Sequence, residues 1–185
     1  MKSANYCTDF TEPSSISNKN LQKIIQFYLF ECPVEGKSHR GKTFKQLGYS
    51  GSLSFSKLKK NLLQAATPSL KGNYIPSKKS ELPSNFRKCE AITYPDEYCV
   101  FLENDKNGVV SSLFSAIRNA LAHGSFNVRC YKKIRIYYFS NYKGYEKARI
   151  ILYEDTLLSW INIIKKECKL NGNLQMQNVR RDTGI

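Results

Sequence analysis

The segment from Gly108 to His123 has a hydrophobic pattern that only one regular structure satisfies. Placed at about 100° per residue, its large apolar side chains fall on one continuous arc, as in an amphipathic α-helix. Gly124 follows directly, and glycine is a common helix-terminating residue. The sequence therefore predicts a helix over 108–123. The apolar arc that would pack into a core comprises Val109, Val110, Leu113, Phe114, Ala116, Ile117, Ala120 and Leu121.

The opposite arc of this helix carries small and polar residues, bordered by Arg118 on one edge and His123 on the other. These two residues lie about 140° apart around the helix axis, which predicts a shallow polar groove between them. An arginine can hold a phosphate with two parallel hydrogen bonds, and a histidine can transfer a proton near neutral pH. In the alternative interpretation, His123 only caps the negative end of the helix dipole and Arg118 is an ordinary solvated residue. The groove would be lined by Gly108, Ser111, Ser112, Ser115, Asn119 and Ala122.

The charge of the chain favours a polyanionic partner. Its 185 residues include 29 lysines and arginines against 15 aspartates and glutamates, a formal net charge of +14. Such a field concentrates nucleic acid near the protein surface and speeds its arrival. The charge is also compatible with a role in solubility alone. We therefore expect a nucleic-acid partner from the charge, and the arginine and histidine of the helix indicate RNA.

Cysteine usage and hydropathy predict a cytoplasmic protein without a metal or another cofactor. None of the six cysteines is spaced as C-x-x-C, and only two histidines accompany them, which argues against a zinc site. The first residues lack the apolar core of a signal peptide. No stretch approaches the roughly 18 apolar residues of a membrane span. We expect reduced thiols and no membrane association.

The remaining segments suggest one domain over residues 17–170, between a flexible segment at 1–16 and a polar tail at 171–185. Apolar residues at helical spacing predict helices over 17–32 and 54–66, and a last helix starting near Glu154. Residues 67–107 contain four prolines and are expected to form an irregular insert. Residues 127–152 predict a β-hairpin, with apolar strands over 134–139 and 148–152 around a loop that contains Gly144.

Residues 117–124, with the sequence Ile-Arg-Asn-Ala-Leu-Ala-His-Gly, resemble the Arg-x4-His motif of HEPN domains (higher eukaryotes and prokaryotes nucleotide-binding). The similarity extends over residues 108–168 and is to stand-alone HEPN proteins of bacterial mobile elements and defence loci. It implies a mainly α fold, a HEPN-like bundle of about four core helices with a β-hairpin inserted between the last two. It also implies a homodimer with a composite active site, endoribonuclease activity in toxin–antitoxin or antiphage defence, and a possible antitoxin or other partner protein. The implied active-site residues are Arg118, Asn119 and His123.

The chemistry of these three residues is consistent with cleavage of RNA without a metal. His123 can act as general base on a ribose 2′-hydroxyl, whose oxygen attacks the adjacent phosphate and leaves a 2′,3′-cyclic phosphate. Arg118 can stabilise the charge that grows on the phosphorane oxygens. Asn119 can orient the imidazole or bind the phosphate. One histidine cannot easily serve as both base and acid, so we expect a symmetric dimer to supply the second.

Basic and aromatic residues near the hairpin predict binding of single-stranded RNA, because cations bind phosphates and aromatic rings stack on unpaired bases. The equally simple alternative is a hairpin with a polar outer face and an aromatic inner face. The RNA-binding candidates are Arg129, Lys132, Lys133, Arg135 and Tyr138.

Two other functions compete with the nuclease. Residues 36–43 match G-x-x-x-x-G-K-[ST], the phosphate-binding loop of nucleotide hydrolases, which requires a preceding strand and a following helix. The sequence predicts a helix before this segment and a glycine-interrupted stretch after it, so the match is a weak indication of nucleotide binding. The second alternative is a non-catalytic dimer that binds RNA or regulates another protein.

Overall fold

The computed structural model describes residues 18–36, 41–90, 96–104 and 108–166. It shows a mixed five-stranded sheet with helices, and about 50% of the described residues are helical and 23% are in strands. The expected mainly α fold, a helical bundle with an inserted hairpin, is therefore wrong, and the protein has an α/β fold. The expected N-terminal segment and C-terminal tail, residues 1–16 and 171–185, lie outside the described residues.

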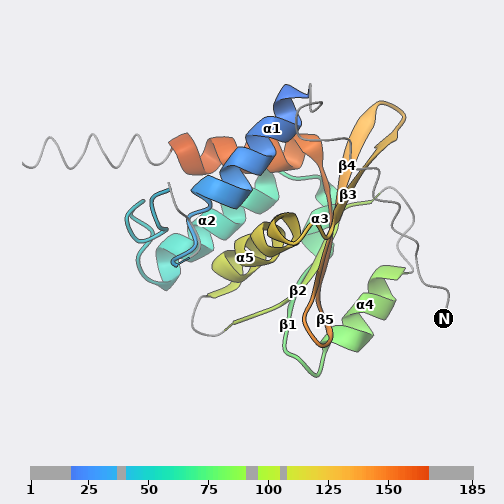
Figure 1. Ribbon diagram of the computed structural model, residues 1–185. Coiled ribbons are helices and arrows are strands. Elements are labelled where there is room, and N and C mark those ends of the chain that lie inside the picture. The colour runs from blue at the N-terminus through green and yellow to red at the C-terminus, as the bar shows by residue number, and fades with distance from the viewer. Residues whose placement is uncertain (1–17, 37–40, 91–95, 105–107, 167–185) are drawn as a thin grey trace, which may run out of the picture.

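The sheet has the strand order β1-β2-β5-β4-β3 (Figure 1). Its strands are β1 (Tyr74–Ser77), β2 (Tyr98–Leu102), β3 (Phe126–Tyr131), β4 (Ile134–Tyr142) and β5 (Glu146–Tyr153). Strands β1 and β2 are parallel, whereas the pairs β2–β5, β5–β4 and β4–β3 are antiparallel. The parallel pair is joined by a crossover that contains a helix, as parallel connections require.

Two tight turns build the antiparallel part of the sheet. The predicted hairpin is confirmed as β4 and β5, whose connecting loop contains Gly144 at φ 77°. A second hairpin joins β3 to β4, because Tyr131 pairs with Ile134 and only Lys132 and Lys133 lie between them. Both lysines have positive φ, 46° and 70°, as the preferred two-residue hairpin turn demands. The chain therefore adds β3 to the hairpin and extends the sheet beyond what the apolar pattern predicted.

Helices cover both faces of the sheet (Figure 1). Helix α5 (Gly108–Ala122) packs its apolar arc into the main core, where Phe114 lies against Trp160 and Tyr28. Helix α4 (Leu82–Glu90) lies on the opposite face and forms a smaller core with Tyr98 and Val100 of β2. Residues of β2 alternate between these two cores, with Cys99 and Phe101 in the main core and Tyr98 and Val100 in the smaller one.

The other predicted helices are confirmed with small changes. The N-terminal helix comprises α1 (Lys19–Ile25), capped by Asn18, and a π-helical continuation η2 (Gln26–Glu31). Helix α2 (Ser52–Gln64) is held to the C-terminal helix, described over residues 154–166, by a hydrogen bond of 2.9 Å from Trp160 Nε1 to the Leu62 carbonyl. Among the described residues, no helix is both long and apolar enough to cross a membrane.

The described part of segment 67–107 is regular and not an irregular insert, which corrects the expectation from its prolines. It contains α3 (Pro68–Gly72), β1, α4 and β2. Pro68 and Pro83 lie in the first turns of α3 and α4, where a missing N–H costs little, and Pro76 lies in the edge strand β1. These three prolines therefore lie at the starts of helices and in an edge strand.

A buried carboxylate ties this segment to the rest of the protein. Glu97 is 0% exposed and accepts hydrogen bonds from the backbone N–H and the hydroxyl of Thr67, at 3.1 and 2.5 Å. Its other oxygen accepts from the N–H of Tyr153, at 2.7 Å. Since Thr67 precedes α3 and Tyr153 ends β5, one side chain positions both elements.

Candidate functional site

The C-terminal end of α5 places the candidate catalytic segment on the surface. The Ser125 N–H bonds to the Ala120 carbonyl at 2.8 Å, and the Gly124 N–H bonds to the Leu121 carbonyl at 3.3 Å. With Gly124 at φ 65°, these two bonds form a Schellman motif, which satisfies the last helix carbonyls and turns the chain toward β3. His123, directly before the glycine, is exposed at the end of the helix. The predicted helix end at Gly124 is confirmed.

Arg118 lies partly buried on α5. No ion pair joins it to another described residue, whereas Arg135 and Arg149 both pair with glutamates. Its Nε is buried and has no hydrogen-bond partner in the described part of the protein. A guanidinium is always charged, and a buried donor without a partner is costly. This atom is therefore a donor that no described residue uses.

The serines expected to line an open groove are mostly buried within the protein, which corrects that expectation. Ser111, Ser112 and Ser115 are only 5–8% exposed. Ser112 donates from its hydroxyl to the Gly108 carbonyl at 2.8 Å and accepts from the Asn104 N–H at 3.0 Å. The sheet covers this side of the helix, which helical periodicity alone did not indicate.

What remains of the groove is a pocket of about 130 Å³, which Asn119 lines together with polar and apolar residues. Ser115 lines it too, and its buried Oγ has no partner in the described part of the protein. The pocket extends from α5 to the ends of three strands, and its other lining residues are Leu102, Asn104, Ser112, Ala116, Asn141 and Lys147. The pocket therefore places Asn119 among other residues that can form hydrogen bonds, whereas Arg118 does not line it.

Within one chain, Arg118 and His123 do not face each other. They are separated by about 140° around the axis of α5 and by about 7.5 Å along it. Helical side chains also lean toward the N-terminus, so Arg118 points away from the end that carries His123. Asn119 and His123 are one turn apart, and the His123 N–H bonds to the Asn119 carbonyl at 3.0 Å. A complete site that uses both Arg118 and His123 requires a long substrate or a second copy of the helix.

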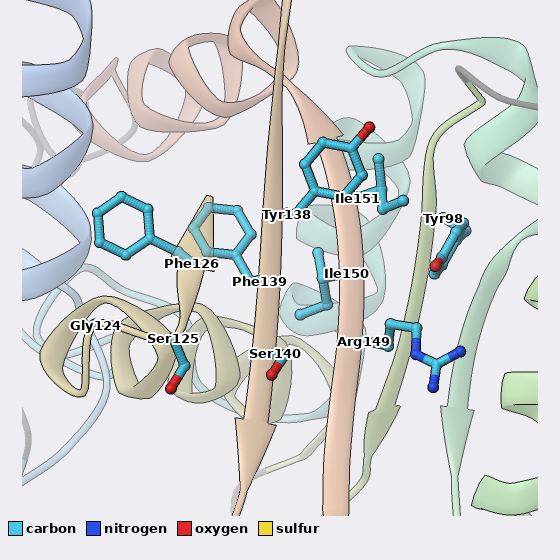
Figure 2. Close-up of a pocket in the computed structure, with 10 residues that line it drawn as sticks. All are labelled: Tyr98, Gly124, Ser125, Phe126, Tyr138, Phe139, Ser140, Arg149, Ile150 and Ile151. Atoms are coloured by element: carbon cyan, nitrogen blue, oxygen red, sulfur yellow. The ribbon is translucent and has the colours of Figure 1, made fainter. Parts of the chain in front are cut away.

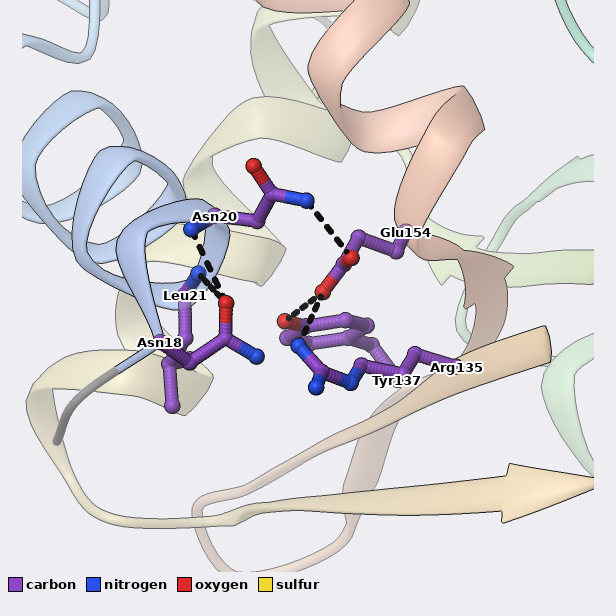
Figure 3. Close-up of polar contacts among 6 residues, drawn as sticks. All are labelled: Asn18, Asn20, Leu21, Arg135, Tyr137 and Glu154. Carbon is purple, nitrogen blue, oxygen red and sulfur yellow. Dashed lines mark hydrogen bonds and ion pairs between the residues drawn. The ribbon is translucent and has the colours of Figure 1, made fainter. Parts of the chain in front are cut away.

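Among the five RNA-binding candidates, Arg135 forms an ion pair within the protein. The Arg135 guanidinium lies 3.5 Å from Glu154, which also accepts hydrogen bonds from Tyr137 at 2.9 Å and Asn20 at 2.8 Å (Figure 3). Burial, followed by this hydrogen bond to a carboxylate, raises the pKa of Tyr137 well above its usual value. Arg135 therefore forms an ion pair between β4 and the start of the C-terminal helix, and its role in RNA binding stays a prediction.

The other candidates lie on the β3–β4 hairpin. Lys132 and Lys133 are exposed in its turn. The Arg129 guanidinium lies 5.3 Å from the ring centre of Tyr138, a cation–π contact across the two strands. Tyr138 belongs to the sheet face that carries α4, whereas its neighbours Tyr137 and Phe139 point into the main core.

A second hollow, of about 230 Å³, lies on this sheet face and was not predicted from the sequence (Figure 2). Its walls come from β2, β3, β4 and β5 and from the turn after α5, where Gly124 and Ser125 follow His123 directly in the chain. The lining residues are Tyr98, Gly124, Ser125, Phe126, Tyr138, Phe139, Ser140, Arg149, Ile150 and Ile151. The alternation of residues along β4 and β5 was visible in the sequence, but their pairing with β2 was not.

The surroundings of the phosphate-loop match differ from those of a nucleotide hydrolase. Residues 37–40 lie outside the described residues. Helix η2 precedes the segment, and Thr43–Tyr49 form hydrogen-bonded turns after it. The strand and the helix that such a loop requires are not found at these described flanks.

Comparison of this chain with protein-family models, with curated proteins and with solved structures finds no match. Among the described residues, no group of three histidine, cysteine, aspartate or glutamate side chains is arranged to hold a metal ion.

Proposed function

We propose that this protein is a metal-independent endoribonuclease that cleaves single-stranded RNA. The observation that carries the proposal is the partly buried Arg118, whose Nε has no partner among the described residues and whose charge no described acid compensates. It lies five residues before the exposed His123, in a chain with a net charge of +14. An uncompensated guanidinium and an exposed imidazole on one helix provide a phosphate ligand and a proton acceptor.

The reaction that fits these groups is an internal transesterification. His123 takes the proton of a ribose 2′-hydroxyl, and the 2′-oxygen forms a bond to the adjacent phosphorus. The bond from phosphorus to the 5′-oxygen breaks, and that oxygen takes a proton from a general acid. The products are a 2′,3′-cyclic phosphate and a free 5′-hydroxyl. Arg118 stabilises the negative charge on the phosphorane, and Asn119, one turn before His123, orients the imidazole or binds the phosphate.

The general acid comes from a second copy of the chain in this proposal. Arg118 and His123 of one chain diverge on α5, so in this proposal a homodimer brings two α5 ends together. It supplies each phosphate with an arginine and with His123 of both copies, one as general base and the other as general acid. The sequence similarity of residues 117–124 to HEPN nucleases supports this arrangement, although the fold is not a helical bundle. Reduced cysteines and an RNA substrate fit a cytoplasmic protein. An effector role in toxin–antitoxin or antiphage defence, with a restraining partner protein, follows from the same similarity.

The same divergence favours one competing function, a dimer that binds RNA without cutting it. In that case Arg118 binds a phosphate, and His123 serves only as the last residue of α5. The two functions differ in whether RNA is cleaved and share the dependence of RNA binding on Arg118.

The test is incubation of purified protein with RNA in excess chelator, followed by analysis of the new ends. We expect 2′,3′-cyclic phosphate and 5′-hydroxyl ends. His123→Ala should reduce the rate by roughly 10²–10⁴-fold and Arg118→Ala by roughly 10²–10³-fold. Arg87→Ala, at an exposed arginine of α4, is the matched control and should retain the wild-type rate. Cleavage at the wild-type rate by both site variants would show that the nuclease assignment is wrong. RNA binding without cleavage would support the competing function.

A further inference from the structure

We propose that the cavity beside His123 binds one unpaired base of the RNA and so selects the phosphodiester bond that is cut. This inference rests on the proposed nuclease function and adds a specificity subsite to it. The cavity shown in Figure 2 is the hollow on the α4 face of the sheet, next to the C-terminal end of α5.

The walls of the cavity have the chemistry of a base-binding site. Tyr138 and Ile151 provide aromatic and apolar surface, on which a base can stack. Ser125 and Ser140 lie at the lower end of the cavity in Figure 2, and their hydroxyls can hydrogen-bond to a base edge. This combination of apolar walls and a few polar groups is typical of small-molecule sites.

The walls are also held rigid. Arg149 is fixed by both oxygens of Glu146, at 3.0 and 2.8 Å, and by Glu90, at 2.8 Å. Its guanidinium lies 5.0 Å from the ring centre of Phe86 in α4. Arg129 packs over the Tyr138 ring. A preformed site loses less conformational entropy when it binds a ligand than a mobile one does.

The size of the cavity suits a fragment of RNA. Its volume of about 230 Å³ is below the roughly 300–1,000 Å³ of pockets that hold drug-sized molecules. It therefore suits a single base and not a whole oligonucleotide. The backbone would continue outside it, where the exposed Arg129 and the lysines at the β3–β4 turn supply positive charge.

The position of the cavity couples it to the proposed catalytic residue. Gly124 and Ser125 line it and follow His123 directly in the chain. The Ser140 N–H donates to the Ser125 carbonyl at 3.0 Å, which fixes the turn after α5 to β4. A base held against this turn therefore brings a particular phosphate to His123, and cleavage should occur at a fixed distance from that base.

Binding is tested first, with a probe that cannot be cleaved. The probe is a 2′-deoxy oligonucleotide with one 2-aminopurine, whose fluorescence falls when it stacks on an aromatic ring. We expect quenching by the wild-type protein and by His123→Ala. We expect a roughly 5- to 150-fold higher Kd for Tyr138→Ala, from the loss of one stacked base. Ser140→Phe, which fills the cavity without removing a wall, should weaken binding similarly. The control Tyr142→Ala, at a tyrosine that is 71% exposed outside the cavity, should bind as the wild type does.

Cleavage is tested with RNA oligonucleotides that carry a single abasic nucleotide at successive positions. We expect one position, at a fixed distance from the cut, to lower kcat/KM in the wild type and to have no effect in Tyr138→Ala. Quenching that depends on Tyr138 in a protein that does not cut RNA would overturn the proposed nuclease but support the base site. Cleavage that is insensitive to every abasic position, with probe Kd values for Tyr138→Ala and Ser140→Phe within twofold of the wild type, would overturn the base site alone.

Discussion

Replacing Arg118 by methionine should make the protein more stable while abolishing its activity. A buried donor without a partner costs about 1–3 kcal/mol, and Arg118 Nε is such a donor among the described residues. Methionine keeps an unbranched apolar stem of similar length and a similar helix propensity, so packing on α5 is retained. Because the remainder of the guanidinium is partly hydrated, we expect the free energy of unfolding to rise by about 1–2 kcal/mol. For a chain of 185 residues, this corresponds to a rise in Tm of roughly 2–8 °C.

The assay is thermal unfolding monitored by circular dichroism, with and without a non-cleavable oligonucleotide. The oligonucleotide should raise the Tm of the wild type, because a ligand that binds only the folded state stabilises it, and should have a much smaller effect on Arg118→Met. Arg87→Met is the control for the loss of one positive charge at an exposed site. A fall of several degrees in the Tm of Arg118→Met, with an unchanged response to the oligonucleotide, would mean that the arginine is structural and would refute the reasoning.

Three further predictions follow from the fold. Glu97→Gln should lower the free energy of unfolding by about 2–4 kcal/mol, because it removes the charge and one acceptor oxygen of a side chain that accepts three hydrogen bonds. A decrease of less than about 0.5 kcal/mol in urea denaturation would contradict this prediction. Gly124→Ala should lower the free energy of unfolding by about 1–2 kcal/mol in the same assay, because residue 124 has a positive φ. An unchanged free energy of unfolding would mean that the Schellman geometry is not required. The pKa of Tyr137 is raised in the folded state. The stability that this residue contributes is therefore complete below the usual tyrosine pKa near 10 and is lost as the pH rises above that value. Tyr137→Phe should therefore reduce the alkaline slope of stability by up to about 1.4 kcal/mol per pH unit, and an unchanged slope would exclude Tyr137 as its source.

Elements with a strong hydrophobic periodicity were predictable from the sequence, and elements that form only by pairing with a distant strand were not. Helix α5 and the hairpin β4–β5 were recognised because periods of 3.6 and 2 residues are local properties. Strand β1, with four residues and Pro76, has no such signal. It exists because it pairs with β2, about 25 residues further along the chain, and such a contact leaves no mark on a short window of sequence.

The candidate site shows the same division. The sequence singled out Arg118, Asn119 and His123 by residue type and spacing, and the structure adds that Arg118 Nε lacks a partner in the described part of the protein. The buried serines of α5 were misjudged, because burial on a second helix face depends on where the sheet lies. The ion pair between Arg135 and Glu154 could not be predicted either, because Glu154 follows β5 and lies near Arg135 only in the folded protein.

By itself, the sequence determined the chemical groups available, the net charge of +14, and the helix that ends at Gly124. These are properties of single residues and of one-turn spacing. Only the tertiary structure decided that the fold is α/β, that the serine face of α5 is covered, and that a cavity lies beside His123. The physical reason is that strand pairing, burial and cavities depend on contacts between residues far apart in the chain, whose free energy no local pattern contains.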